Sequence, residues 1–143
     1  MDEYFDNFLI LDKFNVSRET FSTLNEFREK IIEKNNEINL ISTKSISNSM
    51  NRHIIDCAQV IDLIDINSKT CTDIGSGAGL PGIVLSILVR DKKIDMKMNL
   101  YEKSYRKSSF LRSVSKEFKL NTEIFEEDIF KKKNLVSGSI VTR

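Results

Sequence analysis

The residues best suited to chemistry lie between positions 73 and 82, where an aspartate is followed by glycines at every second position. Gly75, Gly77 and Gly79 have this spacing, and Gly82 follows three residues after the last of them. Glycine is needed where the backbone adopts a positive φ or where a ligand approaches the main chain closely. The stretch before Asp73 alternates like a short buried strand, and apolar residues at helical spacing follow Pro81, which is tolerated in the first turn of a helix. The segment therefore predicts a strand, a glycine turn and a helix whose N-terminus points at a ligand.

Two classes of ligand use this geometry. Residues 77–82 satisfy the dinucleotide pattern G-x-G-x-x-G, which alone is a weak signal. The frame D-x-G-x-G-x-G, which begins at Asp73, fits better and is similar to the first motif of class I S-adenosylmethionine-dependent methyltransferases. In that class the glycines let the amino-acid end of the cofactor lie against bare backbone, and a carboxylate such as Asp73 can attract its ammonium group. The alternative is a turn that binds no ligand and only packs a helix against a sheet.

Glu102 is the second informative residue. It closes a predicted strand over residues 95–102 and lies 23 residues beyond Gly79. Doubly wound nucleotide-binding folds place a carboxylate there on the ribose hydroxyls, so Glu102 supports adenosine binding in either ligand class. The acidic residues 126–128 follow another predicted strand near 122–126, where methyltransferases place the adenine. Either group could instead be an ordinary solvated strand end.

The remaining reactive side chains give weaker signals. The single histidine, His53, is more typical of a packed, hydrogen-bonded residue than of a catalyst. Cys57 and Cys71 have no metal-ligand spacing and no neighbouring base, so both are expected to be reduced core residues. The sequence therefore predicts no metal site and leaves the catalytic residue unknown.

The order of the elements predicts an α/β protein. Helices are expected near 2–14, from Ser17 to about 35, and over 46–64; strands and helices then alternate from about residue 69. This alternation favours a doubly wound, Rossmann-like parallel sheet with helices on both faces. We expect a helical extension at 1–66 and a Rossmann-like domain at 67–143, which is incomplete because such sheets normally have further strands.

Charge is distributed unevenly along the 143 residues. Residues 1–66 hold 7 Lys and Arg against 12 Asp and Glu, whereas residues 67–143 hold 15 against 9, within an overall net charge of +1. The basic half suits a polyanionic substrate, although a solvated lysine-rich surface explains it equally well. On the helix expected at 104–119, Arg106 and Arg112 are the candidates for substrate contact. The chain has no apolar run long enough to span a bilayer and no leader pattern, so a cytoplasmic protein is expected.

Four stretches in the right order resemble one family, the bacterial small-subunit ribosomal RNA methyltransferase G family (RsmG/GidB). They are Asn39–Ser42, Arg52–Asp56, Asp73–Ile83 and Arg106–Arg112. The resemblance implies methylation of a guanine N7 in 16S rRNA with S-adenosylmethionine. Carried over by position, it implies cofactor contacts from Gly75, Leu80, Asp128, Ile129 and Arg143. It also implies 16S rRNA, or the assembling small subunit, as the partner of a monomer, with Arg52, Arg106 and Arg112 as candidate RNA contacts. The sequence departs from the family at Asp128, where an aliphatic residue is common, and stops where the family continues.

The sequence has no clear candidate for a general base and no amine-methyltransferase motif, which agrees with methylation at guanine N7. Guanine N7 has a lone pair and no proton, so its attack on a sulfonium methyl group needs alignment and no general base. The proline motif of amine methyltransferases is missing after the last strand, where the chain has Val141-Thr142-Arg143. Two alternatives stay open: a dinucleotide-dependent oxidoreductase, and a non-catalytic RNA-binding module with a vestigial pocket.

Overall fold

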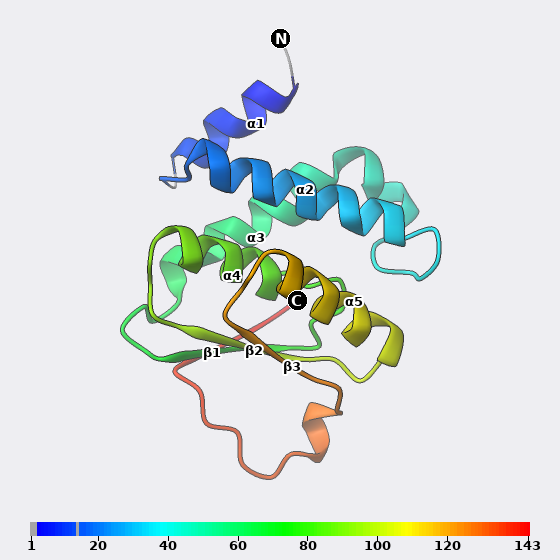
Figure 1. Cartoon of the computed structure of the whole chain (residues 1–143), viewed down its shortest axis with the longest axis vertical. Helices are drawn as coiled ribbons and strands as arrows, with labels where there is room; N and C mark the ends of the chain where they lie inside the picture. The colour runs from blue at the N-terminus through cyan, green and yellow to red at the C-terminus, as the bar shows by residue number, and fades with distance from the viewer. Residues whose placement is uncertain (1–2, 14) are drawn as a thin grey trace.

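The computed structural model describes residues 3–13 and 15–143. It is built on a four-stranded parallel sheet with the order β3-β2-β1-β4, so the chain reverses its direction across the sheet after β3 (Figure 1). The strands are β1 (Thr70–Ile74), β2 (Lys97–Tyr101), β3 (Thr122–Phe125) and β4 (Ser139–Thr142). This arrangement confirms the predicted α/β class, and β1, β2 and β3 each begin within two residues of the expected start.

Nearly all helices of the described residues lie in two layers on one side of the sheet, and the short turn η4 (Ile129–Lys131) lies on the other side (Figure 1). The helices on the first side are α1 (Glu3–Asp12), α2 (Arg18–Lys34), η1 (Thr43–Asn48), η2 (Met50–Ile55), α3 (Asp56–Ala58), η3 (Gln59–Leu63), α4 (Gly82–Asp91) and α5 (Tyr105–Glu117). The layer against the sheet contains α4 and α5, and α1 and α2 lie outside it. The predicted ends of the first helix, Asp2 and Phe14, lie outside the described residues.

Local sequence explains where the long helices begin. Ser17 caps α2 as expected, because its Oγ accepts a hydrogen bond from the Thr20 amide at 3.1 Å. Ser104 caps α5 in the same way through the Lys107 amide, at 3.4 Å. Pro81 differs slightly from its expected place, since it is the residue before α4 and not part of the first turn.

The third predicted helix, 46–64, is not one continuous α-helix. It is a succession of tight and wide turns, η1, η2, α3 and η3. In η2 the Asp56 amide donates to the Asn51 carbonyl, one residue further back than in an α-helix, so the Arg52 carbonyl accepts from the Arg143 side chain at 2.8 Å. The apolar spacing was still informative, because it correctly predicted the buried face. That face includes Met50, Ile54, Cys57, Ala58, Ile61 and Ile64.

Helices on both faces of the sheet were expected, but in the described chain α4 and α5 cover one face only (Figure 1). Residues 126–138 cross the other face as an extended segment with the single turn η4, because their polar, lysine-rich sequence has no apolar helical spacing. Lys132 Nζ donates to Tyr101 Oη at 2.8 Å, and Thr72 Oγ1 donates to Ser137 Oγ at 2.9 Å. These contacts attach the segment to the sheet at its middle and near its C-terminal end.

The core is one continuous cluster. It runs from Phe27 on α2 through Ile54 and Leu85 to Met98 on β2, all fully buried. The helical layers and the sheet therefore stabilise each other by burying shared apolar surface. The boundary between residues 66 and 67 stays a prediction. No described helix has the length and apolar character needed to cross a membrane.

Candidate functional site

Predicted site residues from three strands meet at the carboxyl ends of β1, β2 and β3. They border a cavity of about 200 Å³, here called the strand-end cavity. Its lining consists of Ile74, Gly75, Tyr101, Glu102, Lys103, Glu127, Asp128, Ile129 and Phe130. The structure thus brings together Gly75, Glu102, Asp128 and Ile129, which lie up to 54 positions apart in the sequence. Ligands of open α/β sheets bind at such an edge.

Asp73 is fully buried beneath the glycine turn. Its Oδ2 accepts a hydrogen bond from the Gly82 amide at 2.9 Å, at the start of α4, while its Oδ1 has no partner among the described residues. Burial raises the pKa of this carboxyl group to about 7, although the Gly82 amide opposes the shift. A buried carboxylate oxygen without a donor is costly, so Asp73 has unused capacity to accept a hydrogen bond or to pair with a cation.

The glycines of the turn serve two different purposes. Gly75 and Gly77 have φ of +69° and +56°, and a Cβ on either would meet no atom closer than 3.9 Å, so the space above them is open to a ligand. Gly79 and Gly82 are needed for packing: a Cβ on Gly79 would lie 2.5 Å from Ile83 Cγ1, and one on Gly82 would lie 2.5 Å from Asp73 Oδ2. The first pair therefore forms a cradle, and the second pair lets α4 approach the sheet.

Glu102 joins the glycine turn to the start of α5. Its Oε2 accepts from the Gly77 amide at 2.8 Å and its Oε1 accepts from the Ser104 amide at 3.0 Å. The side chain is almost buried and borders the cavity, and each oxygen retains a lone pair for a hydroxyl donor. Sequence spacing predicted the ribose role but missed this contact with the turn, which no local pattern indicates.

At the far end of the cavity, Asp128 caps η4 by accepting from the Phe130 amide at 3.0 Å. Its carboxylate is therefore partly engaged, and Ile129 follows it at the cavity wall. Phe130 borders the same cavity with 92% of its side chain exposed, a large apolar surface left uncovered at the rim. Sequence analysis did not single out Phe130.

Five of the nine predicted cofactor contacts are not in the lining of the strand-end cavity. Asp73, Gly77 and Gly79 belong to the strand and turn beside it, and Leu80 and Arg143 lie further away. Leu80 is buried in the core behind the turn. Arg143 follows β4, where its Nη2 donates to the Arg52 carbonyl at 2.8 Å and its Nη1 to Cys57 Sγ at 3.6 Å. Burial raises the pKa of Cys57 to about 12, so this thiol stays protonated, as expected for a core residue.

Arg143 borders a second opening, here called the helix–strand cavity. Its lining consists of Ser42, Ser45, Asn51, Arg52, His53, Asp56 and Arg143. Ser45 Oγ lies 2.7 Å from the Ser42 carbonyl, to which it can donate, and 2.8 Å from His53 Nε2. With the Ser45 proton on that carbonyl, the histidine is assigned as the Nε2–H tautomer, and its buried Nδ1 has no partner among the described residues. Burial, reinforced by Arg143 and Arg52, lowers the pKa of His53, which therefore stays neutral at pH 7.

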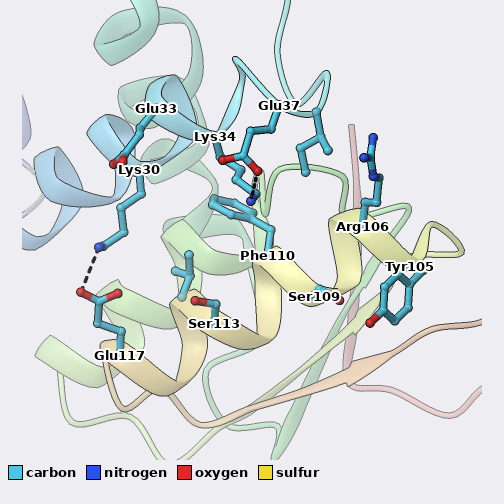
Figure 2. A pocket seen from close by; sticks show the side chains of 12 residues that line it. Lys30, Glu33, Lys34, Glu37, Tyr105, Arg106, Ser109, Phe110, Ser113 and Glu117 are labelled. Carbon is cyan, nitrogen blue, oxygen red and sulfur yellow. Dashed lines mark hydrogen bonds and ion pairs between the residues drawn. The ribbon is translucent and has the colours of Figure 1, made fainter.

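The three predicted RNA contacts are not brought together. Arg52 borders the helix–strand cavity, whereas Arg112 Nη1 donates to Glu126 Oε2 at 3.3 Å near β3. Arg106 lies in a groove of about 480 Å³ between α2 and α5, beside the exposed ring of Tyr105 (Figure 2). Other cations of this groove are paired, Lys30 with Glu117 and Lys34 with Glu37 (Figure 2). Among the described residues, no group of histidines, cysteines and carboxylates could hold a metal ion.

The strand order, the glycine cradle and the carboxylates at the strand ends define the class as a Rossmann-like fold of the methyltransferase type. A crystal structure of coclaurine N-methyltransferase bound to N-methylheliamine and SAH has the same fold, with a TM-score of 0.50 and 14% identity, over 99% of this chain and 51% of that one. The family model described as GidB, rRNA small subunit methyltransferase G, matches residues 20–143. The chain belongs to this family.

Sequence relatives from three bacteria carry the name of the same family. Proteins named ribosomal RNA small subunit methyltransferase G are 47% identical over the whole chain in Pelagibacter ubique, 43% identical over 73% of it in Ruegeria sp., and 38% identical over 82% of it in Bartonella tribocorum. The chain spans 68%, 51% and 56% of the length of these three relatives.

Proposed function

We propose that the protein transfers a methyl group from S-adenosylmethionine to guanine N7 in 16S ribosomal RNA. The observation that carries the proposal is the strand-end cavity, where the open turn at Gly75 and Gly77 faces the Glu102 carboxylate in a member of the GidB family. When bound, the cofactor supplies an electrophilic sulfonium methyl group.

The residues of the strand-end cavity fit such a donor. Glu102 has acceptor capacity for ribose hydroxyls, and Asp128 and Ile129 border the part of the cavity beyond it, where an adenine would lie. The unpartnered Oδ1 of Asp73, beneath the turn, has capacity to accept a hydrogen bond from the ammonium group of the donor, whose positive charge would favour the ionised carboxylate. The protein therefore has residues for each polar part of the molecule.

Methylation of guanine N7 requires no proton transfer by the protein. Because N7 attacks with its own lone pair, the protein contributes alignment of the two reactants and exclusion of water. This agrees with a site in which the only nearby histidine is neutral and donates to Ser45. We propose no general base for this reaction.

The proposal also concerns partner and compartment. A 16S rRNA substrate, free or in an assembling subunit, places the protein in the cytoplasm of a bacterium. We propose that it acts as a monomer, which sedimentation analysis at micromolar concentration tests directly.

Titration calorimetry with S-adenosylmethionine and NAD in parallel tests the cofactor. We expect binding of S-adenosylmethionine and none of NAD; the reverse result would identify an oxidoreductase. Small subunits from cells lacking the gene, incubated with protein and radiolabelled S-adenosylmethionine, should gain N7-methylguanosine. RNA binding without methyl transfer would favour the non-catalytic module.

A further inference from the structure

The helix–strand cavity lies directly beside the strand-end cavity at the same edge of the sheet. Ile74 lines the strand-end cavity and pairs in register with Thr142, whose Oγ1 donates to the Ile74 carbonyl at 3.1 Å. Arg143, the next residue, lines the helix–strand cavity. Since Glu102 and Asp128 lie on the β2–β3 side of β1, a donor with its adenosine there would extend across the glycine turn toward β4. The helix–strand cavity lies on that side of the turn.

Three side chains of the helix–strand cavity are already engaged in hydrogen bonds across its wall. Arg143 donates to the Arg52 carbonyl and to Cys57, and His53 donates to Ser45, which in turn donates to Ser42. These contacts hold the wall of the cavity in place.

The Asp56 carboxylate is different. It is exposed, it borders the cavity, and it makes no hydrogen bond or ion pair with any residue that the structure describes. It lies among cations, because both Arg52 and Arg143 line the same cavity without pairing with it. A carboxylate can accept two parallel N–H hydrogen bonds, and Asp56 is the carboxylate among the residues that line this cavity.

We propose that Asp56 selects guanine by accepting hydrogen bonds from N1–H and the 2-amino group of the acceptor base. This inference rests on the proposed function. The two donors lie on the Watson–Crick edge of guanine, opposite the edge that carries N7, so a base held by Asp56 presents N7 away from the carboxylate. Adenine offers a bare N1 at the corresponding position, which faces the carboxylate with a lone pair.

A site built to accept hydrogen bonds rejects analogues that lack the donors, because its own acceptor is then left unpaired. Inosine lacks the 2-amino group and therefore loses one of the two hydrogen bonds to Asp56. Adenosine has neither N1–H nor a 2-amino group and loses both. Discrimination should therefore increase from inosine to adenosine. The free guanidinium of Arg52 on the same wall suits the phosphate of the same nucleotide.

The test measures binding of guanosine, inosine and adenosine monophosphates by NMR titration of the 143-residue protein saturated with S-adenosylhomocysteine. The wild type should bind the guanine nucleotide about tenfold more tightly than the adenine nucleotide, with inosine between them. Asp56→Asn should reduce this preference below about twofold. The matched control Asp62→Asn, an exposed carboxylate on η3 outside both cavities, should retain it.

Two results would overturn the inference: equal binding of guanine and adenine nucleotides by the wild type, or an unchanged preference in Asp56→Asn. The wild-type comparison needs no folded variant. Calorimetry with S-adenosylmethionine and methyl transfer to small subunits, on the same preparations, separate the two hypotheses. If both succeed while Asp56→Asn keeps its preference, only the role of Asp56 is wrong; if the wild type fails both, the proposed function is wrong.

Discussion

The two cavities at the sheet edge are built in different ways. In the strand-end cavity, the side-chain hydrogen bonds that hold the glycine turn and Glu102 span at most 25 positions, such as the bond from the Gly77 amide to Glu102, and the key residues follow strands directly. The helix–strand cavity depends on contacts such as that between Arg143 and the Arg52 carbonyl, 91 positions apart. The first is thus set by local strand–turn–helix units, whereas the second exists only once β4 has joined the sheet.

The largest effect is expected for Glu102→Ala, which removes the ribose acceptor and releases the glycine turn. Loss of two hydrogen bonds to a charged group should raise the Kd for S-adenosylmethionine about 100-fold. Calorimetry measures this. The control Glu123→Ala removes an exposed carboxylate paired with Lys97 on the same sheet and should leave the Kd unchanged. Equal affinity of wild type and Glu102→Ala would remove Glu102 from the site.

Alanine substitutions in the two glycine pairs should lower the free energy of unfolding by different amounts. Gly79→Ala places a Cβ 2.5 Å from Ile83 Cγ1 and should lower the free energy of unfolding by about 2 kcal/mol. Gly77→Ala meets open space and should lose only about 1 kcal/mol, from its φ of +56°. Urea denaturation compares them. Equal losses would contradict the distinction between cradle and packing glycines.

A pH series tests the buried carboxyl group of Asp73. Because its pKa is raised to about 7 in the folded state, the folded protein keeps a proton that the unfolded chain loses above its ordinary pKa. Stability from this group is full at low pH and falls as pH rises through about 7. We expect the free energy of unfolding of the wild type, relative to Asp73→Asn, to fall by on the order of 2 kcal/mol from pH 5 to pH 8. A constant difference across the series would mean that Asp73 is ionised throughout.

The smallest effect on stability is expected for Arg143, which borders the helix–strand cavity. Arg143→Gln removes the long-range bond to the Arg52 carbonyl and should cost about 1 kcal/mol or less, since the contact is exposed. Hydrogen exchange should nevertheless become faster at amides of η2 and α3, with amides of β2 unchanged as an internal control. If η2 and α3 exchange as in the wild type, Arg143 does not hold this segment.

The difference between the cavities also explains what the sequence could predict. Asp73, the glycines and Glu102 lie at strand ends that periodicity locates, so their meeting at one edge follows from parallel pairing. The η2 turn was predicted as α-helix because apolar spacing reports the buried face and not the hydrogen-bond register. The polar segment 126–138 likewise gave no sign of crossing the second face of the sheet, and the free carboxylate of Asp56 emerges only from its three-dimensional surroundings.

The central claim is that the strand-end cavity holds the adenosine of S-adenosylmethionine. A crystal structure with S-adenosylhomocysteine tests it most directly. The account predicts both ribose hydroxyls within hydrogen-bond distance of Glu102, with the backbone of Gly75 and Gly77 against the amino-acid part. A nucleoside bound elsewhere, with Glu102 still bonded only to the Gly77 and Ser104 amides, would contradict it.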